Sequence, residues 1–139
     1  MSDSKTAKTV LILGGGAGGI VAANILRKLL PREHRIIVID QEGKHLFASS
    51  LLWVMVGMRR ADQIVRPLDR LNRKGIEFVQ GRIEKINPES KSVQVSGREF
   101  SGDAMIISLG ADLVPETIPG LNESGRNIYT LDGATAIYK

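Results

Sequence analysis

The stretch that decides the fold spans residues 9–30 and reads TVLILGGGAGGIVAANILRKLL. Residues 9–13 are almost all apolar and rich in branched side chains, which favours a central parallel strand buried on both faces. From Gly18 to Leu30 the apolar residues recur at helical spacing, and Pro31 ends the helix. Residues 14–19 therefore form a tight glycine-rich turn between a strand and a helix.

The rest of the chain extends this unit into an α/β fold. Residues 35–40, RIIVID, predict a second parallel strand, and the first strand, turn, helix and second strand together occupy about 32 residues, the size of a βαβ unit. Residues 76–80 and 104–110 predict two further strands. Between these two strands, short stretches separated by turn residues predict an antiparallel meander at 82–87, 92–96 and 98–100. The expected fold class is an α/β parallel sheet with helices and an inserted antiparallel β-meander.

Three other segments have weaker patterns. Pro67 fits the first position of a helix that Gly75 ends, and the chain from residue 111 onward carries several Pro and Gly residues, which predicts loop. Residues 47–58 fit either a short buried helix or an apolar loop. Within that segment Trp53, Met55 and Met58 have two interpretations, core packing or the lining of a ligand pocket, and core packing is the commoner role for such residues.

Each part of the glycine turn has a physical task if a dinucleotide binds there. Gly14 permits the tight turn out of the strand, Gly16 lets the backbone approach a pyrophosphate, and Gly19 lets the helix pack close to the strand. The phosphates would lie at the helix N-terminus, beside Ala17 and Gly18, where free amides and the positive end of the helix dipole converge.

The acid at the end of the second strand supports the same ligand. Asp40 lies 21 positions after Gly19, the spacing at which a carboxylate accepts hydrogen bonds from both ribose hydroxyls. A carboxylate there repels a 2′-phosphate, so the sequence predicts FAD or NAD rather than NADP, with Gln41 in the same site. The alternative is that Asp40 is only a strand-end acid in the turn Asp40–Gly43.

Composition excludes several other classes of function. The 139 residues suit one domain, with residues 1–8 as a disordered tail and 9–139 as the folded part. The net charge of +4 comes from scattered basic residues, which does not predict nucleic-acid binding. There is no cysteine and no metal-ligand spacing, and no catalytic residue is identified. The longest apolar run, 51–58, is far shorter than the ~20 residues of a spanning helix, so a cytoplasmic location is expected.

The last predicted strand carries a resemblance to a known family. It ends in Ser108-Leu109-Gly110-Ala111, and Pro115 and Ile118-Pro119-Gly120 follow. This pattern resembles the FAD domain of the pyridine nucleotide-disulfide oxidoreductase superfamily, where an apolar strand ending in Ala-Thr-Gly passes near the cofactor. The resemblance implies a Rossmann-like FAD/NAD(P)-binding domain that holds FAD, with NAD the weaker candidate. It places Ser108, Leu109 and Gly110 near the flavin and backbone groups of Ile83 near the adenine. Leu109 stands where the family has Thr, so no hydroxyl contact is expected there.

A second segment resembles one branch of that superfamily. Residues 44–52, KHLFASSLL, are similar to the segment beside the flavin in sulfide:quinone reductases, flavocytochrome c sulfide dehydrogenases and type II NADH dehydrogenases. The resemblance implies that His45 lies near the flavin, although a lone histidine is more often structural. It also implies a sulfide or NADH donor, a quinone or haem-protein acceptor, and peripheral contact with a membrane.

Other parts of that family have no counterpart in these 139 residues. They include the NAD(P)-like second domain, a later Gly-Asp motif that holds the flavin, and the cysteine pair of the sulfide-oxidising members. The expectation is therefore an FAD-dependent oxidoreductase of which this chain is the N-terminal part. A different class of function stays open, namely a module that binds NAD or FAD without turnover of its own.

Overall fold

The computed structural model describes residues 6–138. The chain divides into two compact units: unit 1 comprises Met1–His45 and Pro67–Gly110, and unit 2 comprises Leu46–Arg66 and Ala111–Lys139. Of the tail expected over residues 1–8, residues 1–5 lie outside the described part. Lys8 is hydrogen-bonded through its amide to Nδ1 of His34 and through its carbonyl to the amide of Arg35.

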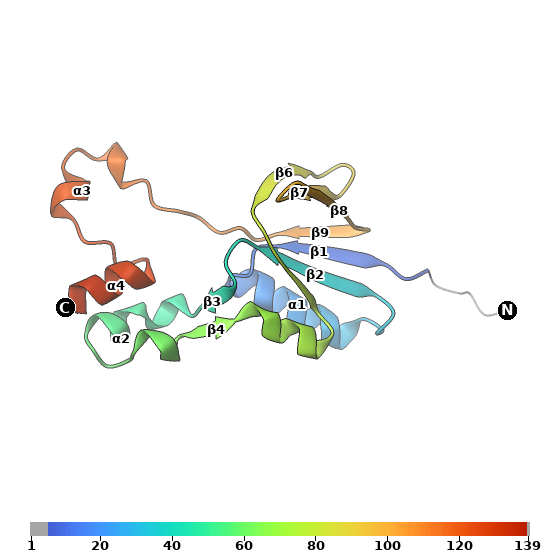
Figure 1. The fold of residues 1–139 in the computed structure, drawn as a ribbon, viewed down its shortest axis with the longest axis horizontal. Coiled ribbons are helices and arrows are strands. Elements are labelled where there is room, and N and C mark those ends of the chain that lie inside the picture. The colour runs from blue at the N-terminus through green and yellow to red at the C-terminus, as the bar shows by residue number, and fades with distance from the viewer. Residues whose placement is uncertain (1–5, 139) are drawn as a thin grey trace. The chain divides into compact units, whose positions relative to one another are not determined.

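Unit 1 is built on a parallel four-stranded sheet of order β5-β2-β1-β9 (Figure 1). Its strands are β1 (Thr9–Leu13), β2 (Arg35–Asp40), β5 (Glu77–Gln80) and β9 (Ala104–Ile107). The first three agree with the strands predicted from the sequence, whereas β9 ends three residues before the predicted Gly110. Helix α1 (Ala17–Leu29) connects β1 to β2, so the predicted βαβ unit is confirmed.

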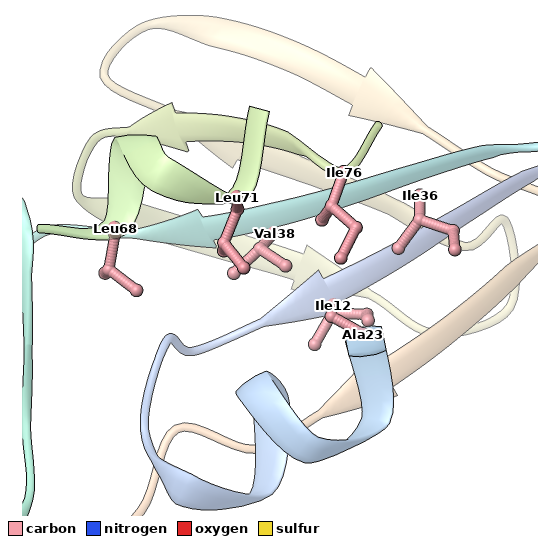
Figure 2. Packing of buried hydrophobic residues seen from close by; sticks show 7 residues of the cluster. All are labelled: Ile12, Ala23, Ile36, Val38, Leu68, Leu71 and Ile76. Atoms are coloured by element: carbon pink, nitrogen blue, oxygen red, sulfur yellow. The ribbon is translucent and has the colours of Figure 1, made fainter. Parts of the chain in front are cut away.

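The two faces of this sheet have separate hydrophobic cores because successive strand side chains point to opposite sides. On one face Ile12, Ile36 and Val38 pack against α1 and the 3-10 helix η3 (Leu68–Lys74). Figure 2 labels this cluster, which contains Ile12, Ala23, Ile36, Val38, Leu68, Leu71 and Ile76. On the other face Leu11, Leu13, Ile37 and Ile39 pack against Val93 and Val95 of the meander. Burial on both faces explains why β1 and β2 are continuous apolar runs.

The predicted meander is a three-stranded antiparallel sheet of order β6-β7-β8. Its strands are β6 (Ile83–Asn87), β7 (Ser92–Val95) and β8 (Arg98–Ser101). Ser96 and Gly97 connect β7 to β8 with φ angles of 47° and 75°, and two consecutive positive φ angles are typical of a type I′ hairpin turn. The meander covers the face of the parallel sheet opposite α1 (Figure 1).

The region around Pro67 differs from the prediction. Pro67 is the last residue of a short strand, β4 (Val65–Pro67), and not the first residue of a helix. Strand β4 pairs with β3 (Lys44–Leu46) in a two-stranded sheet that the sequence pattern does not reveal. Helix η3 starts one residue later, and it ends at Gly75 as predicted, with φ of 76°. Pro67 keeps an extended backbone, with ψ of 133°, which suits a strand end better than a first helical turn.

Unit 2 consists of short helices around a small core. They are η1 (Ala48–Ser50), α2 (Leu51–Met55), η2 (Ala61–Gln63), η4 (Pro115–Thr117), α3 (Leu121–Ser124) and α4 (Leu131–Tyr138). Leu51 and Val54 of α2 are buried with Ile64 and Ala134. The short buried helix is thus the correct alternative for this part of 47–58.

Two predictions in unit 2 are wrong. The chain after residue 111 is not all loop, because it contains helix α4. The hydroxyl of Thr130 accepts a hydrogen bond from the amide of Gly133 at 3.1 Å and so caps the start of this helix. The prediction of core packing is wrong for Trp53 and Met58, which are 42% and 72% exposed, and it holds for Met55, which packs against the core of unit 2. None of the helices formed by residues 6–138 is long and apolar enough to cross a membrane.

Candidate functional site

Three strands of unit 1 end at one edge of the parallel sheet. β1 runs into the glycine turn at Gly14, β2 ends with Asp40, and β9 is followed by Ser108. Strand β1 lies between β2 and β9. After β1 the chain forms β2 on one side of it, and much later in the sequence it forms β9 on the other side. Ligands of open α/β sheets bind in the crevice outside the carboxyl ends of the strands, at such a switch in strand order.

The glycine turn is held tightly against its surroundings. The Gly14 amide donates to the carbonyl of Ile39 at 2.8 Å, and Gly14 has φ of 103°, where a side chain would be strained. A Cβ atom on Gly14 would lie 2.3 Å from the Ser108 carbonyl oxygen, and one on Gly19 would lie 1.9 Å from the Gly14 oxygen. Backbone therefore packs directly on backbone at both positions.

The start of α1 is open, in contrast to the packed turn. A Cβ atom built on Gly16 would meet no atom of residues 6–138 within 4 Å, so packing against this part of the chain does not require glycine there. The first helical hydrogen bond runs from the Ile20 amide to the Gly16 carbonyl at 3.0 Å, and the amides before it lack helical partners. No side chain in the described part of the chain caps Gly16, and the first turn has no acidic residue. This helix end can therefore receive an anion.

The carboxylate of Asp40 is fixed by two backbone amides. Its Oδ2 atom accepts a hydrogen bond from the amide of Gly15 at 2.6 Å, and its Oδ1 atom accepts one from the amide of Glu42 at 2.7 Å. Each carboxylate oxygen has two acceptor positions, and residues 6–138 fill one on each oxygen, so a second position remains on each oxygen. The contact with Glu42 is the turn contact of the alternative interpretation, and the binding of ribose hydroxyls at the remaining acceptor positions stays a prediction. Both interpretations of Asp40 are thus compatible with one geometry.

A cleft of about 400 Å³ opens beside this carboxylate. Its lining residues are Gly14, Asp40, Gln41, Glu42, Arg82, Ile83 and Leu109. The structure thus brings together five residues that the sequence predicted for one site. Glu42 and Arg82 were not predicted as site residues, although each is next in sequence to a predicted one, Gln41 and Ile83, and this adjacency is the signal that could have found them. Within residues 6–138 there is no group of His, Asp and Glu side chains that could hold a metal ion.

Comparison with known sequences identifies the family of the chain. Residues 8–139 match the profile of the family described as pyridine nucleotide-disulphide oxidoreductase. The chain belongs to this family. The resemblance drawn from the glycine turn, Asp40 and the strand before Gly110 is confirmed.

Relatives in the family include quinone-reducing enzymes. The chain is 31% identical over 115 residues to the mitochondrial sulfide:quinone oxidoreductase of Mus musculus, covering 82% of this chain and 25% of the relative. It is 33% identical over 135 residues to the sulfide-quinone reductase of Aquifex aeolicus, covering 96% and 31%. The type II NADH:quinone oxidoreductase of Staphylococcus aureus is 27% identical over 125 residues, with coverages of 87% and 31%.

A solved structure supports the fold assignment. The X-ray structure of the Aquifex aeolicus sulfide:quinone oxidoreductase matches with a TM-score of 0.88 at 30% identity, over 95% of this chain and 31% of that chain. The α/β fold class predicted from the sequence is therefore confirmed. The chain spans about a quarter to a third of the length of these relatives.

The family resemblance placed Ser108, Leu109 and Gly110 near the flavin, and the structure gives these three residues surroundings that differ from one another. The Ser108 hydroxyl donates to the carbonyls of Leu13 at 2.9 Å and Gly14 at 3.3 Å, so it ties the end of β9 to the glycine turn. Leu109 is 52% exposed and lines the cleft. Gly110 has φ of 78° and does not line the cleft. A contact of these residues with a cofactor stays a prediction.

His45 contacts the glycine turn rather than the cleft. Its Nδ1 atom is hydrogen-bonded to the carbonyl oxygen of Gly15 at 2.9 Å, and it is not among the residues that line the cleft. Ala17 and Gly18, also predicted for the site, lie in the first turn of α1 beside the open N-terminus.

Two other hollows of unit 1 lie near the opposite ends of the strands, with volumes of about 300 and 610 Å³. Both are lined by Arg27 and Arg32. The guanidinium of Arg27 donates to several main-chain carbonyls, among them that of Leu30 at 2.9 Å, and Arg32 donates to the carbonyl of Lys74 at 3.0 Å. Because the guanidinium groups of these arginines bind main-chain carbonyls of the fold, the two hollows are weaker candidates for a ligand site than the cleft beside Asp40.

Proposed function

We propose that unit 1 binds the adenosine diphosphate half of FAD and serves as the cofactor-binding part of a flavin-dependent oxidoreductase. The observation that carries the proposal is the Asp40 carboxylate, which two amides hold at the edge of the cleft with two acceptor positions free. In this proposal Asp40 binds the ribose, and the amides from Gly16 to Gly19 bind the pyrophosphate. The adenine occupies the cleft near Gln41 and Ile83.

The charges around the cleft favour an unphosphorylated ribose. Asp40 and Glu42 are acidic, and Arg82 is the basic residue among those lining the cleft. A ribose hydroxyl donates to a carboxylate, whereas a 2′-phosphate would meet repulsion from two of them. The space above Gly16 supports a bound pyrophosphate, because it lets a ligand come as close as the backbone itself.

FAD is favoured over NAD by membership of the family and by the meander inserted before β9. A plain NAD-binding half continues as alternating strands and helices, while this chain places three antiparallel strands at that point. When bound, FAD would supply the oxidation–reduction chemistry, which no side chain identified in this chain provides.

The names of the relatives support a proposal for the donor and the acceptor of electrons. Their names describe sulfide:quinone and NADH:quinone oxidoreductases, which supports sulfide or NADH as donor and a quinone as acceptor, with a haem protein as the other acceptor implied by the resemblance. Because quinones of this kind dissolve in the bilayer, the proposal includes peripheral contact with a membrane. The family's second domain and flavin-holding motif have no counterpart in these 139 residues, and we propose that turnover requires them.

A second candidate is a nucleotide-binding module without turnover. It is favoured by one observation: the site built from Gly14, Gly16, Gly19 and Asp40 can hold the adenosine and phosphates, but no residue is assigned to a reacting ring. In that case the chain would bind NAD or FAD and pass no electrons.

Calorimetric titration of the 139-residue chain with FAD, NAD and NADP tests the ligand. We expect the tightest binding for FAD and none for NADP, and a yellow purified protein would show retained flavin. Tighter binding of NAD than of FAD would support the module, and binding of neither would refute both candidates. Anaerobic addition of NADH or sulfide to an FAD-loaded protein that joins this chain to the family's second domain and flavin-holding motif then separates the enzyme from the module. Bleaching of the yellow colour, and its return with a quinone, is expected only for the enzyme.

A further inference from the structure

The two polar groups of Gly15 are each bound by a side chain from the next two strands. Its amide donates to Asp40 at the end of β2 at 2.6 Å, and its carbonyl is hydrogen-bonded to Nδ1 of His45 in β3 at 2.9 Å. The first bond holds the peptide between Gly14 and Gly15, and the second holds the peptide between Gly15 and Gly16.

The bond to His45 has a defined direction. A carbonyl oxygen only accepts hydrogen bonds, so Nδ1 must carry the proton and donate it. Neutral imidazole with a proton on Nδ1 meets this requirement, and so does imidazolium. The bond therefore needs an N–H donor at this place but not a positive charge.

Fixing the Gly15 carbonyl also fixes the amide of Gly16. In a planar trans peptide the C=O and the following N–H lie in one plane and point in opposite directions. With its carbonyl directed at His45, this peptide directs the Gly16 amide away from His45. Gly16 is the residue before α1 with open space above it, and its amide precedes the first helical bond.

This peptide needs an external restraint. It joins two glycines, which reach both signs of φ at little cost, so it can rotate until its carbonyl replaces its amide. A carbonyl oxygen in that place would repel a phosphate. We propose that His45 is a positioning residue that selects the orientation of the Gly15–Gly16 peptide in which the Gly16 amide is available to an anion.

The ligand part of this proposal rests on the proposed function, and the peptide part does not. The sequence resemblance implied that His45 lies near the flavin. The structure assigns it a different role, because its ring donates to the backbone of the glycine turn and does not line the cleft.

Three variants test the role. His45→Leu removes the donor, and His45→Asn keeps one because the Asn side-chain NH₂ takes the place of Nδ1. His34→Leu is the matched control, since His34 is the chain's other histidine and its Nδ1 accepts the amide of Lys8 instead. The first readout is the Gly16 amide resonance in ¹H–¹⁵N NMR spectra of the ligand-free proteins. We expect one sharp resonance in wild type, His45→Asn and His34→Leu, and a broadened or doubled one in His45→Leu.

The second readout is FAD affinity by calorimetry. We expect about tenfold weaker binding for His45→Leu, the scale of one hydrogen bond, with substantial recovery in His45→Asn and no change in His34→Leu. Equal weakening in the Leu and Asn variants, or an unchanged Gly16 resonance in His45→Leu, would overturn the proposal. If His45→Leu does not fold, His45→Gln, whose donor lies one bond further out, takes its place in both measurements. Failure of wild type to bind FAD refutes the proposed function, while the Gly16 resonance still decides the role of His45.

Discussion

The Asp40 carboxylate and the Gly15 amide are joined by a hydrogen bond of 2.6 Å across 25 residues of sequence. The acid that ends β2 thus shapes the glycine turn that follows β1, and the same acid keeps acceptor positions for a ligand. The hydrogen bond makes Asp40 part of the fold, and the proposed function makes it part of the binding site as well, so its substitution should affect both stability and binding.

Replacement of Asp40 by Ala is expected to weaken FAD binding by about 1–3 kcal/mol, the scale of hydrogen bonds to a charged group. The free energy of unfolding should fall as well, because the amides of Gly15 and Glu42 lose their acceptor. Calorimetry measures the first effect and urea denaturation the second. Asp69→Asn, at an exposed position in the first turn of η3, is the control and should change neither. Unchanged FAD affinity in Asp40→Ala would show that the ribose assignment is wrong.

Replacement of Gly16 by Ala should separate binding from folding. The added Cβ would lie within 4 Å of no atom in the described residues, so the free energy of unfolding should change by no more than about 1 kcal/mol, the scale of a helix N-cap substitution. The methyl group would occupy the space proposed for the pyrophosphate, so FAD binding should be lost in calorimetric titration. Retention of wild-type affinity would place the phosphates elsewhere.

Replacement of Gly14 or Gly19 by Ala should instead damage the fold. Each new Cβ would lie less than 3 Å from a backbone oxygen, that of Ser108 or that of Gly14. At Gly14 the positive φ adds about 1–2 kcal/mol of conformational cost. Thermal unfolding of both variants should begin at lower temperature than in wild type and in Gly16→Ala. A Gly19→Ala protein as stable as wild type would contradict the close packing of the turn on α1.

Replacement of Ser108 by Ala removes a donor from the carbonyls of Leu13 and Gly14. We expect a loss of about 0.5–1.5 kcal/mol of unfolding free energy in urea denaturation, the net value of a typical hydrogen bond. FAD affinity should change much less than in Asp40→Ala, because the hydroxyl is directed at the chain itself. Ser101→Ala, at an exposed position in β8, is the control and should have no effect on stability. A large loss of FAD affinity without loss of stability would instead indicate a direct cofactor contact by Ser108.

An exposed ion pair in unit 2 predicts a pH effect. The Arg60 guanidinium donates to the Asp62 carboxylate at 3.0 Å and lowers the pKa of Asp62 below its ordinary value. Since the pKa is lower in the folded chain than in the unfolded chain, the stabilisation is present above the unfolded pKa and is lost as the pH falls through the folded pKa. Titration followed by NMR of the Asp62 carboxyl should show the low pKa in wild type and a higher one in Arg60→Gln. High salt should reduce the difference, because both side chains are exposed.

Local patterns in the sequence were sufficient to predict the main architecture of unit 1. The runs at 9–13 and 35–40 are apolar at every buried position because the sheet is covered on both faces, and Gly97 marks the hairpin of the meander, although Ser96 belongs to the turn and not to the predicted strand. The pattern after residue 111 was misleading because three of its Pro and Gly residues lie at the ends of short helices: Pro115 begins η4, Gly120 precedes α3 and Gly125 follows α3. Helix α4 depends on the Thr130 cap and on packing of Ala134 against α2, which Pro and Gly counts do not reveal.

The sequence by itself determined the βαβ unit, the glycine turn, the acid 21 positions later and the membership of an oxidoreductase family. Those features depend on neighbours in the chain and on the period of apolar residues. Only the tertiary structure decided where the polar groups of the site are directed: Asp40 to Gly15, His45 to the Gly15 carbonyl, and Ser108 to Leu13 across 95 residues. Hydrogen bonds between segments this far apart in sequence depend on how the strands pack side by side, and no local pattern of residues records their direction.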